Sequence, residues 1–252
     1  MKPARRQKYY LIPFNLALLI RRERLFREFQ TWLLLKHWSN GHLELTPLII
    51  ARLASSLQCS PRTIERTIAR LRERNWLGYN PNNGLTYVRG IDTLQIIEQL
   101  PGRLGVWLDI DRILNVEAFL AACGESFFVR GQKVKAWRQR AAGVHSKRGT
   151  YQPAPLSSFF PVALSLHFSF FGIAKSTAAR ERKLAAAAGF IRIHKRPPQL
   201  ITDNAPAAFL RAYPEKVRYL FQRGGQWFLR PTDEVQTNLL FKRRQHQKKR
   251  KT

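Results

Sequence analysis

The apolar and polar positions between residues 46 and 89 predict two helices followed by a β-hairpin. Ile64, Ile68 and Leu71 recur at helical spacing, which places them on the inner face of the second helix. The first helix is expected to turn a similar apolar set inward: Leu48, Ala51, Leu53, Ala54 and Leu57. The short polar stretch between the helices is therefore a turn that brings two apolar faces together.

Capping signals mark where the two helices begin. Thr46 and Ser60 are N-cap hydroxyls, and each precedes a proline, which the first helical turn tolerates. Beyond the helices, Trp76-Leu77 begins a strand and Asn83-Gly84 is a typical hairpin turn. Residues 86–89 then form the returning strand.

Amphipathic and turn patterns extend on both sides of this stretch. Residues 14–38 read as one long helix that supports the helix pair from behind and ends at Ser39-Asn40-Gly41. Its apolar stripe comprises Leu18, Leu25, Phe29 and Trp32. Three further elements are expected after the hairpin: a helix over 91–100, a strand over 106–110 and a helix over 115–122 with Asn115 as N-cap.

The pattern of this region returns 114 positions later without a gap. The matched positions are Leu48 with Val162, Leu57 with Phe171, Cys59 with Ile173, Thr63 with Thr177, Arg66 with Arg180, and Trp76-Leu77 with Phe190-Ile191. Few of these pairs are identical, so the sequence indicates a repeated pattern. After it we expect a strand over 190–195, a short helix over 205–212 and a hairpin over 217–230 that completes the sheet begun at Phe190.

The charge of the chain narrows the class of partner. Lys and Arg number 44 against 16 Asp and Glu, which gives a formal net charge of +28. An excess of this size repels itself unless a polyanion neutralises it. Nucleic acid is the first candidate, because a protein that binds anionic membranes concentrates its charge in one helix or tail. Here the charge runs through the whole chain.

The residues give little support for disulfides, for a metal site, or for a secreted or membrane-bound protein. Cys59 and Cys123 are too few for a disulfide framework or a zinc site, which favours a reducing, cytoplasmic setting. Asp109 and Asp111 have no third ligand nearby, so we interpret them as capping acids and predict no metal or other cofactor. The apolar run near the N-terminus lacks a cleavage site, and residues 156–174 are too polar for a membrane span, so neither a signal peptide nor a membrane contact is expected.

The first helix pair resembles the winged helix-turn-helix family of DNA-binding domains. The resemblance rests on Ala54, Leu57 and Cys59, followed by the sequence SPRTIER, and covers about 45 residues. Gln58 departs from the family, which more often has glycine in the turn. In the later copy Gly172 and Ile173 fit the turn well, and AKSTAAR follows.

The later copy also departs from the family pattern. His167 and Phe168 replace an apolar and a small residue, and Glu181 takes a position that is often apolar. We interpret His167 as a histidine at the edge of the core rather than a catalytic one.

The resemblance implies a mainly α fold with small β-hairpins, of the α+β class, containing two tandem winged helix-turn-helix domains. The expected parts are a basic arm at 1–13, a first domain at 14–100, a connecting helical segment at 101–142, a basic linker at 143–155, a second domain at 156–235 and a basic tail at 236–252.

By carry-over from the family, the second helix of each pair enters the major groove of double-stranded DNA. The residues expected to meet DNA are Ser60, Arg62, Thr63, Glu65, Arg66 and Arg70 in the first copy, and Lys175, Ser176, Thr177, Ala179, Arg180 and Lys183 in the second. Wings, linker and tail would contact the DNA backbone through Asn82, Asn83, Arg89, Lys147, Arg148, Arg192, Lys195, Arg223, Lys242, Arg243 and Arg244.

The sequence thus predicts a non-enzymatic, sequence-specific DNA-binding protein, cytoplasmic and associated with the nucleoid. Its architecture is similar to that of plasmid replication initiators and of phage and mobile-element regulators, which leaves replication and transcription both open. The first alternative is an RNA-binding or architectural protein, since charge does not distinguish RNA from DNA. A nuclease or recombinase accessory is the second, although no cluster of three carboxylates is evident. Self-association and a replication or transcription partner also stay open.

Overall fold

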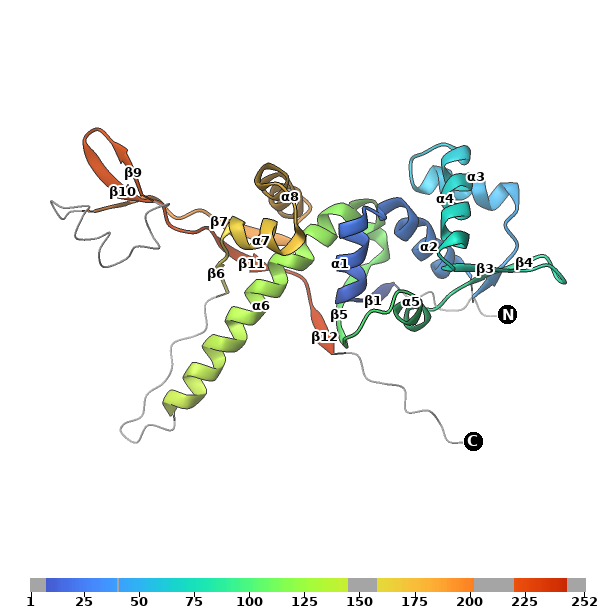
Figure 1. The fold of residues 1–252 in the computed structure, drawn as a ribbon, viewed down its shortest axis with the longest axis horizontal. Helices are drawn as coiled ribbons and strands as arrows, with labels where there is room; N and C mark the ends of the chain where they lie inside the picture. The colour runs from blue at the N-terminus through green and yellow to red at the C-terminus, as the bar shows by residue number, and fades with distance from the viewer. Residues whose placement is uncertain (1–7, 40, 145–157, 202–219, 244–252) are drawn as a thin grey trace.

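The computed structural model describes residues 8–39, 41–144, 158–201 and 220–243. About 52% of the described residues are helical and 22% are in strands, and the sheets are small and antiparallel, so the protein is of the α+β class, as predicted. The molecule is elongated, and one hairpin projects at each end of its long axis (Figure 1).

The described part of the first half of the chain has ten elements. Six of them, from α2 to β4, resemble the predicted order; β1 and α1 precede these six, and α5 and β5 follow them. The elements are β1 (Tyr9–Pro13), α1 (Phe14–Glu23), α2 (Phe26–Trp38), β2 (His42–Leu43), α3 (Pro47–Ser56), α4 (Pro61–Glu73), β3 (Leu77–Asn80), β4 (Leu85–Val88), α5 (Ile91–Ile97) and β5 (Leu104–Asp109).

The second half follows β5 directly through a short 3-10 helix. Its elements are η1 (Ile110–Asn115), α6 (Val116–Val144), β6 (Phe160–Pro161), α7 (Leu164–Phe171), α8 (Lys175–Ala187), β7 (Ile191–His194), β8 (Gln199–Leu200), β9 (Leu220–Arg223), β10 (Gln226–Leu229), β11 (Glu234–Thr237) and β12 (Phe241–Arg243). The helix expected over 205–212 lies outside the described residues.

Local signals in the first helix pair are confirmed. The Thr46 hydroxyl accepts the Ile49 backbone N–H, and the Ser60 hydroxyl accepts that of Thr63 at 3.2 Å. Ile64, Ile68 and Leu71 are buried, as are Leu53, Ala54 and Leu57. The prediction was wrong for Leu48 and Ala51, which are exposed because α3 packs mainly on α4 and they lie on the far side of the helix.

The long helix expected over 14–38 is two helices. Arg24 adopts a left-handed conformation with φ 58°, and the Leu25 backbone N–H bonds back to the Ile20 carbonyl at 2.9 Å. This pattern is typical of a helix C-terminus that glycine usually makes. The break lets α1 pack on α6 while α2 packs behind α4.

The helix predicted over 115–122 is much longer. It extends over 29 residues as α6, and Asn115 is the last residue of the 3-10 helix rather than a simple N-cap. The basic stretch after Val129 is rich in Lys, Arg, Gln and Ala, which favour helix, and no proline interrupts it. The C-terminal half of α6 therefore projects from the body of the molecule (Figure 1).

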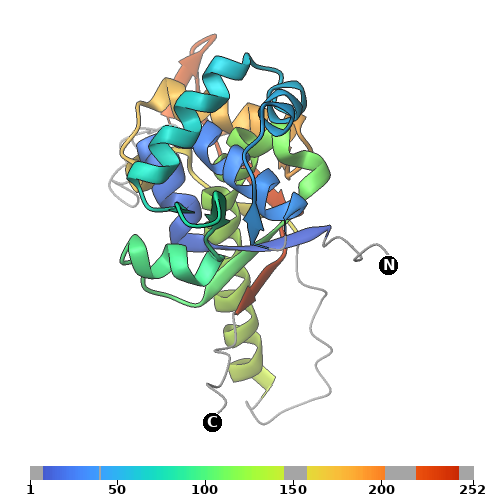
Figure 2. The ribbon, with the colours of Figure 1, turned by 90° about the vertical axis from the view of Figure 1, so that its right-hand side faces the viewer.

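A three-stranded sheet joins the two ends of the described chain. Its order is β1-β5-β12, with Tyr9 opposite Asp109 and Phe241 opposite Val106. Residues 9–13 were expected in the basic arm and 236–243 in the basic tail, but both ranges contribute residues to sheets and bury apolar side chains, such as Ile12 and Leu239. In Figure 2, α1 and α2 lie above these strands.

Two further sheets have the same order of strands. The first is β2-β4-β3 and the second is β6-β11-β7, and all their pairs are antiparallel. The hairpin β9–β10 was expected beside β7, but it pairs with β8 in a separate sheet. The strand that pairs with β7 is β11, whose Val235 is fully buried there, so β11 takes the place in this sheet that was expected for the hairpin.

The chain therefore contains two units with a common element order. The first is α2–β2–α3–α4–β3–β4, and the second is α6–β6–α7–α8–β7–β11, with β8, β9 and β10 inserted between β7 and β11. The bounds of α8 and β7 lie 114 positions after those of α4 and β3. Gln58 and Gly172, at the same offset, both have a left-handed φ, of 51° and 64°, and Asn75 and Gly189 form a second such pair. The repeat seen in the sequence thus extends to backbone conformation.

Candidate nucleic-acid interface

The outer face of α4 is polar and open. Ser60, Arg62, Thr63, Glu65 and Arg66 are exposed, because the apolar positions of this helix all turn toward α2 and α3. These are the residues that the sequence predicted for contact with DNA.

Arg70, the sixth predicted residue of this set, is held by the protein itself. Its Nη1 lies 3.1 Å from Oε1 of the buried Glu28 on α2. Burial of a carboxylate requires a partner, so Arg70 fixes α4 on its supporting helix while the rest of its side chain is exposed. Sequence reasoning missed Glu28, because nothing local marks an acid in the middle of α2 as buried.

Further contacts hold α4 in place at both ends. Near its C-terminus, Arg74 donates to both carboxylate oxygens of Glu98 and to Glu23 at 2.7 Å. The Arg74 guanidinium lowers the pKa of Glu23. At the turn before α4, Arg27 donates to the Leu57 carbonyl at 2.7 Å. Helix α4 is therefore a rigid support for the side chains on its outer face.

The hairpin β3–β4 extends beside α4. Its tip exposes Asn82 and Asn83, and the Asn83 side chain accepts the Leu85 backbone N–H at 3.1 Å. Arg89, predicted to contact the backbone of DNA, is half-buried and donates to the Asn75 side chain. We therefore assign Arg89 to the support of the hairpin.

Helix α8 presents a second polar face. Lys175, Ser176, Arg180 and Lys183 are exposed, whereas Thr177 and Ala179 of the predicted set are half-buried. Helices α6 and α7 cover the opposite side of α8. In Figures 1 and 2, α4 and α8 both lie in the upper part of the molecule, away from the projecting end of α6.

A buried cluster of charges fixes α8 to the first half of the chain. Arg21 of α1 binds the carboxylate of Glu181, and Arg182 binds that of Glu125 on α6 at 2.6 and 3.0 Å. All four side chains are at least 94% buried. Removal of one partner from such a pair leaves an uncompensated charge and is strongly destabilising.

His167 of α7 lies between the two carboxylates of this cluster. Its ring nitrogens are 3.2 Å from Glu125 and 3.5 Å from Glu181, but neither makes a well-aligned hydrogen bond. Burial and the neighbouring Arg182 and Arg21 lower the pKa of His167 to about 3. The two residues that depart from the family pattern, His167 and Glu181, are thus members of one buried cluster.

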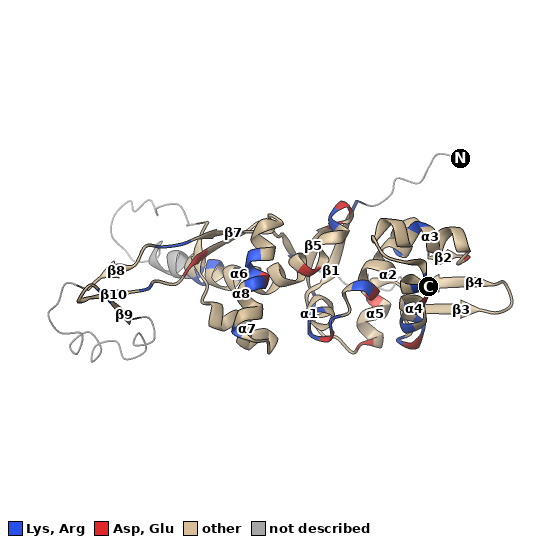
Figure 3. Ribbon diagram, turned by 90° about the horizontal axis from the view of Figure 1, so that it is seen from above, with Lys and Arg blue, Asp and Glu red and all other residues tan. Residues whose placement is uncertain are grey.

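The cations that were predicted to contact the DNA backbone lie on the second half as well. Arg192, Lys195, Arg223 and Lys242 are exposed, and Figure 3 shows Lys and Arg on α4, on α8 and along β7. The backbone of Arg243 belongs to β12. Lys147, Arg148 and Arg244 lie outside the described residues.

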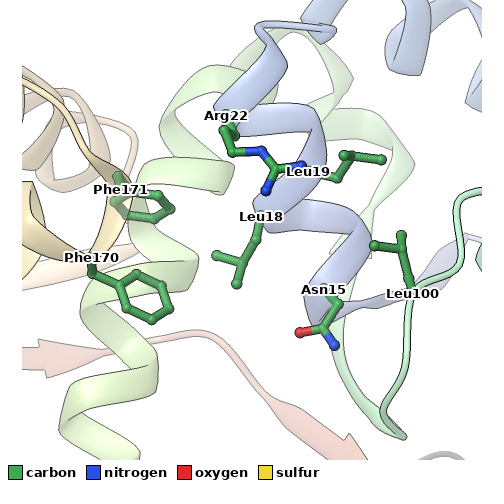
Figure 4. A pocket seen from close by; sticks show the side chains of 7 residues that line it. All are labelled: Asn15, Leu18, Leu19, Arg22, Leu100, Phe170 and Phe171. Carbon is green, nitrogen blue, oxygen red and sulfur yellow. The ribbon is translucent and has the colours of Figure 1, made fainter.

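A hollow of about 270 Å³ lies between α1 and α7 (Figure 4). Leu18, Phe170 and Phe171 supply much of its apolar wall, and Arg22 is its charged lining residue. The arrangement offers no pair of acid and base groups, so we assign no chemistry to it.

Of the two acids expected to cap helices, Asp109 is the N-cap of η1 and Asp111 lies in the first turn of η1. The Asp109 carboxylate accepts the Asp111 backbone N–H at 3.1 Å, and Lys8 pairs with both acids. Within the described ranges, no group of three or more His, Cys, Asp or Glu side chains could hold a metal ion. The same part of the chain contains no helix that is long and apolar enough to cross a membrane.

Comparisons with known proteins add no relative to this description. No protein-family model, curated protein or solved structure matches the chain.

Proposed function

We propose that this protein binds double-stranded DNA through two winged helix-turn-helix units on one chain. Helices α4 and α8 enter successive major-groove segments, and the hairpins and other basic segments contact the flanking phosphates. Arg62, Arg66, Lys175 and Arg180 are the residues that read base edges, because arginine and lysine suit the acceptors of guanine.

The repeated element order is the observation that carries this proposal. A helix, a short strand, two helices joined by a left-handed turn and two more strands occur twice, with sheets of the same order. In each unit the second helix of the pair buries one face and exposes cations on the other; the buried face is mainly apolar in α4 and includes the paired Glu181 and Arg182 in α8. A net charge of +28 supports a polyanionic partner for these faces.

The selection of bound duplexes from a random library by the purified protein tests the proposal. Salt at about 150 mM weakens purely non-specific binding. We expect one motif with two half-sites, since two units on one chain contact one duplex. The location of that motif in a genome, at an origin or at a promoter, separates replication initiation from transcription regulation.

Competition experiments address the alternative of an RNA-binding protein. A labelled duplex that carries the selected motif should be displaced by the same unlabelled DNA and poorly by duplex RNA. Tight binding without any motif, or equal displacement by duplex RNA, would contradict sequence-specific DNA binding. Both recognition helices would then be reassigned to backbone contact.

A further inference from the structure

The sheet β1-β5-β12 has one face whose aromatic residues take no part in the proposed duplex interface; Lys242 is the residue of that face which was also predicted to contact duplex phosphates. Strand periodicity places Tyr10, Ile12, Val106 and Leu108 toward the core, where all four are buried. The opposite face carries Tyr9, Leu11, Trp107, Asp109, Leu240 and Lys242. Tyr9 is 51% exposed and Leu240 is 70% exposed, so this face is open to the surroundings.

Aromatic rings and cations lie next to each other on this face. The Lys242 ammonium is 5.9 Å from the centre of the Trp107 ring, and the Lys8 ammonium is 5.8 Å from the centre of the Tyr9 ring. Leu11 lies across Gly105, where a β-carbon would be 2.7 Å from its Cγ. Because Gly105 has no side chain, the surface at this point of the sheet does not project between the two rings.

A hollow of about 440 Å³ adjoins the rings. Tyr9, Trp107 and Leu240 line it together with Phe190. Asp109 and Arg112 add polar groups at its wall. Apolar walls with a few polar groups suit a flat, partly polar ring system.

Basic sequence segments continue from both edge strands of this sheet. Residues 1–7 precede β1 and contain three Lys or Arg without an acid, and residues 244–252 follow β12 with five. Strand β1 begins opposite Asp109 and β12 ends opposite Leu104, so the two basic segments leave from opposite ends of β5. The sequence on both sides of this sheet is therefore basic.

We propose that this face binds single-stranded nucleic acid, with unpaired bases stacked on Tyr9 and Trp107. Base stacking on aromatic rings between cations is the usual way to hold a single strand. A duplex cannot use such a face, because its bases are already stacked on each other. The site is independent of α4 and α8, so it stands whether or not those helices read a duplex.

The acids at one end of the face set the direction of the bases. Lys8 is paired with Asp109 at 3.6 Å and with Asp111 at 2.9 Å, so its charge is largely compensated. These carboxylates repel phosphates but accept hydrogen bonds from N–H groups of unpaired bases, such as N3–H of thymine and uracil. Base edges therefore lie toward Asp109, and the phosphates lie toward Lys242.

Binding of a fluorescein-labelled oligothymidylate of about 20 nucleotides tests the proposal by anisotropy on the full chain. Trp107→Ala should weaken binding roughly 5- to 150-fold, the effect of one lost stacking contact. Trp107→Phe keeps a stacking ring and should stay within about threefold of the parent protein. Tyr9→Ala should show a loss similar to that of Trp107→Ala.

Trp137→Ala is the matched control, because it removes a tryptophan that is 62% exposed on the distant half of α6. It should leave the affinity for the single strand unchanged. Circular dichroism identifies variants that fail to fold. If Trp107→Ala does not fold, the proposal is tested with Tyr9→Ala instead.

Affinity for a random duplex separates this site from the proposed duplex interface. Trp107→Ala should retain duplex binding, whereas Arg62→Ala should retain single-strand binding. An oligouridylate in place of the oligothymidylate shows whether the strand is RNA or DNA. Unchanged single-strand affinity in folded Trp107→Ala and Tyr9→Ala proteins would overturn the proposal, as would an equal loss in Trp137→Ala.

Discussion

His167 is the residue whose titration has the clearest consequence for stability. Its pKa is lowered to about 3 in the folded state, against about 6.5 for an unperturbed histidine. Below pH 6.5 His167 is therefore protonated in the unfolded chain but stays neutral in the native state. The free energy of unfolding consequently falls as the pH drops. Burial raises the pKa of Glu125, and this has the opposite effect on stability: it makes stability rise as the pH drops. The effect of Glu125 falls mainly at pH values above 4.5, the ordinary pKa of the group.

We expect His167 to cost about 2 kcal/mol of unfolding free energy between pH 6.5 and pH 5. Chemical denaturation at several pH values measures this slope. His167→Gln should flatten it, whereas His194→Asn, which alters an exposed histidine, should not. Equal slopes in the parent and His167→Gln proteins would show that His167 has the same pKa in the native and unfolded states, which would contradict its lowered pKa.

Arg62 and Arg180 are the residues for which base readout is most directly tested. Arg62→Ala or Arg180→Ala should weaken binding to the selected site by about 1–3 kcal/mol and weaken random DNA less. Electrophoretic mobility shifts on the two duplexes measure the difference. Arg103→Ala removes an exposed cation from the loop before β5 and serves as the control.

An equal loss on both duplexes would mean that Arg62 and Arg180 contact phosphates only. Sequence reasoning identified these two exposed arginines correctly as surface residues, because helical periodicity separates inner from outer positions. It could not anticipate that Arg70 pairs with Glu28, because the two residues are 42 positions apart in the sequence and are brought together only by the packing of α2 on α4.

At the scale of single elements, the turns before α4 and α8 can be compared directly, because they have the same backbone conformation but different residues. Gln58 and Gly172 occupy equivalent positions with φ of 51° and 64°. A left-handed conformation costs a residue with a side chain roughly 1 kcal/mol and costs glycine almost nothing. Gln58→Gly should therefore stabilise the protein slightly, and Gly172→Ala should destabilise it by about 1 kcal/mol.

Thermal unfolding of the two variants measures this pair of opposite effects. No atom lies within 4 Å of a β-carbon built at Gly172, so the loss there arises from the backbone rather than from a clash. Gly131→Ala, within α6 and equally open, is the control and should be neutral or stabilising. A shift of the same sign at Gln58 and Gly172 would contradict the equivalence of the turns.

Elements with strong local signals were predictable from the sequence. Thr46 and Ser60 begin α3 and α4 because hydroxyl and proline act within one helical turn, and Asn83-Gly84 specifies its hairpin in the same way. The break at Arg24 was not predictable, because a left-handed arginine carries no sequence signal. Its helix ends there so that two helices can pack on different partners.

At the scale of the whole molecule, the basic segment after β12 contributes charge without sequence information. Removal of residues 244–252 should weaken binding to all DNA alike and lower the dependence of affinity on salt. The deletion begins at 244 because Phe241 to Arg243 pair with β5. Titration of the selected and random duplexes at several salt concentrations measures both effects.

An unchanged salt dependence would mean that residues 244–252 make no contact with DNA. Substitution of the segment's Lys and Arg by Gln at constant length is the matched control for chain length, and it should reproduce the deletion.

Long-range pairing is the part of the architecture that the sequence did not reveal. Strand β12 pairs with β5, and the apolar residues of 9–13 pair with the same strand from the other side. Each of these strands is too short to be specified by its own pattern, so partners distant in the chain decide their conformation. The same reason explains why β11, rather than the β9–β10 hairpin, pairs with β7.

The pairing of β12 with β5 has a consequence for biosynthesis. Residues 104–109 leave the ribosome long before residues 241–243 are made, so one edge of β5 has no partner while the second half of the chain is synthesised. An unpaired edge strand is a template for pairing with other chains. The sheet β1-β5-β12 can therefore be completed only after most of the polypeptide has been synthesised. Premature termination within the second half leaves a product in which the edge of β5 from Leu104 to Val106 is unpaired.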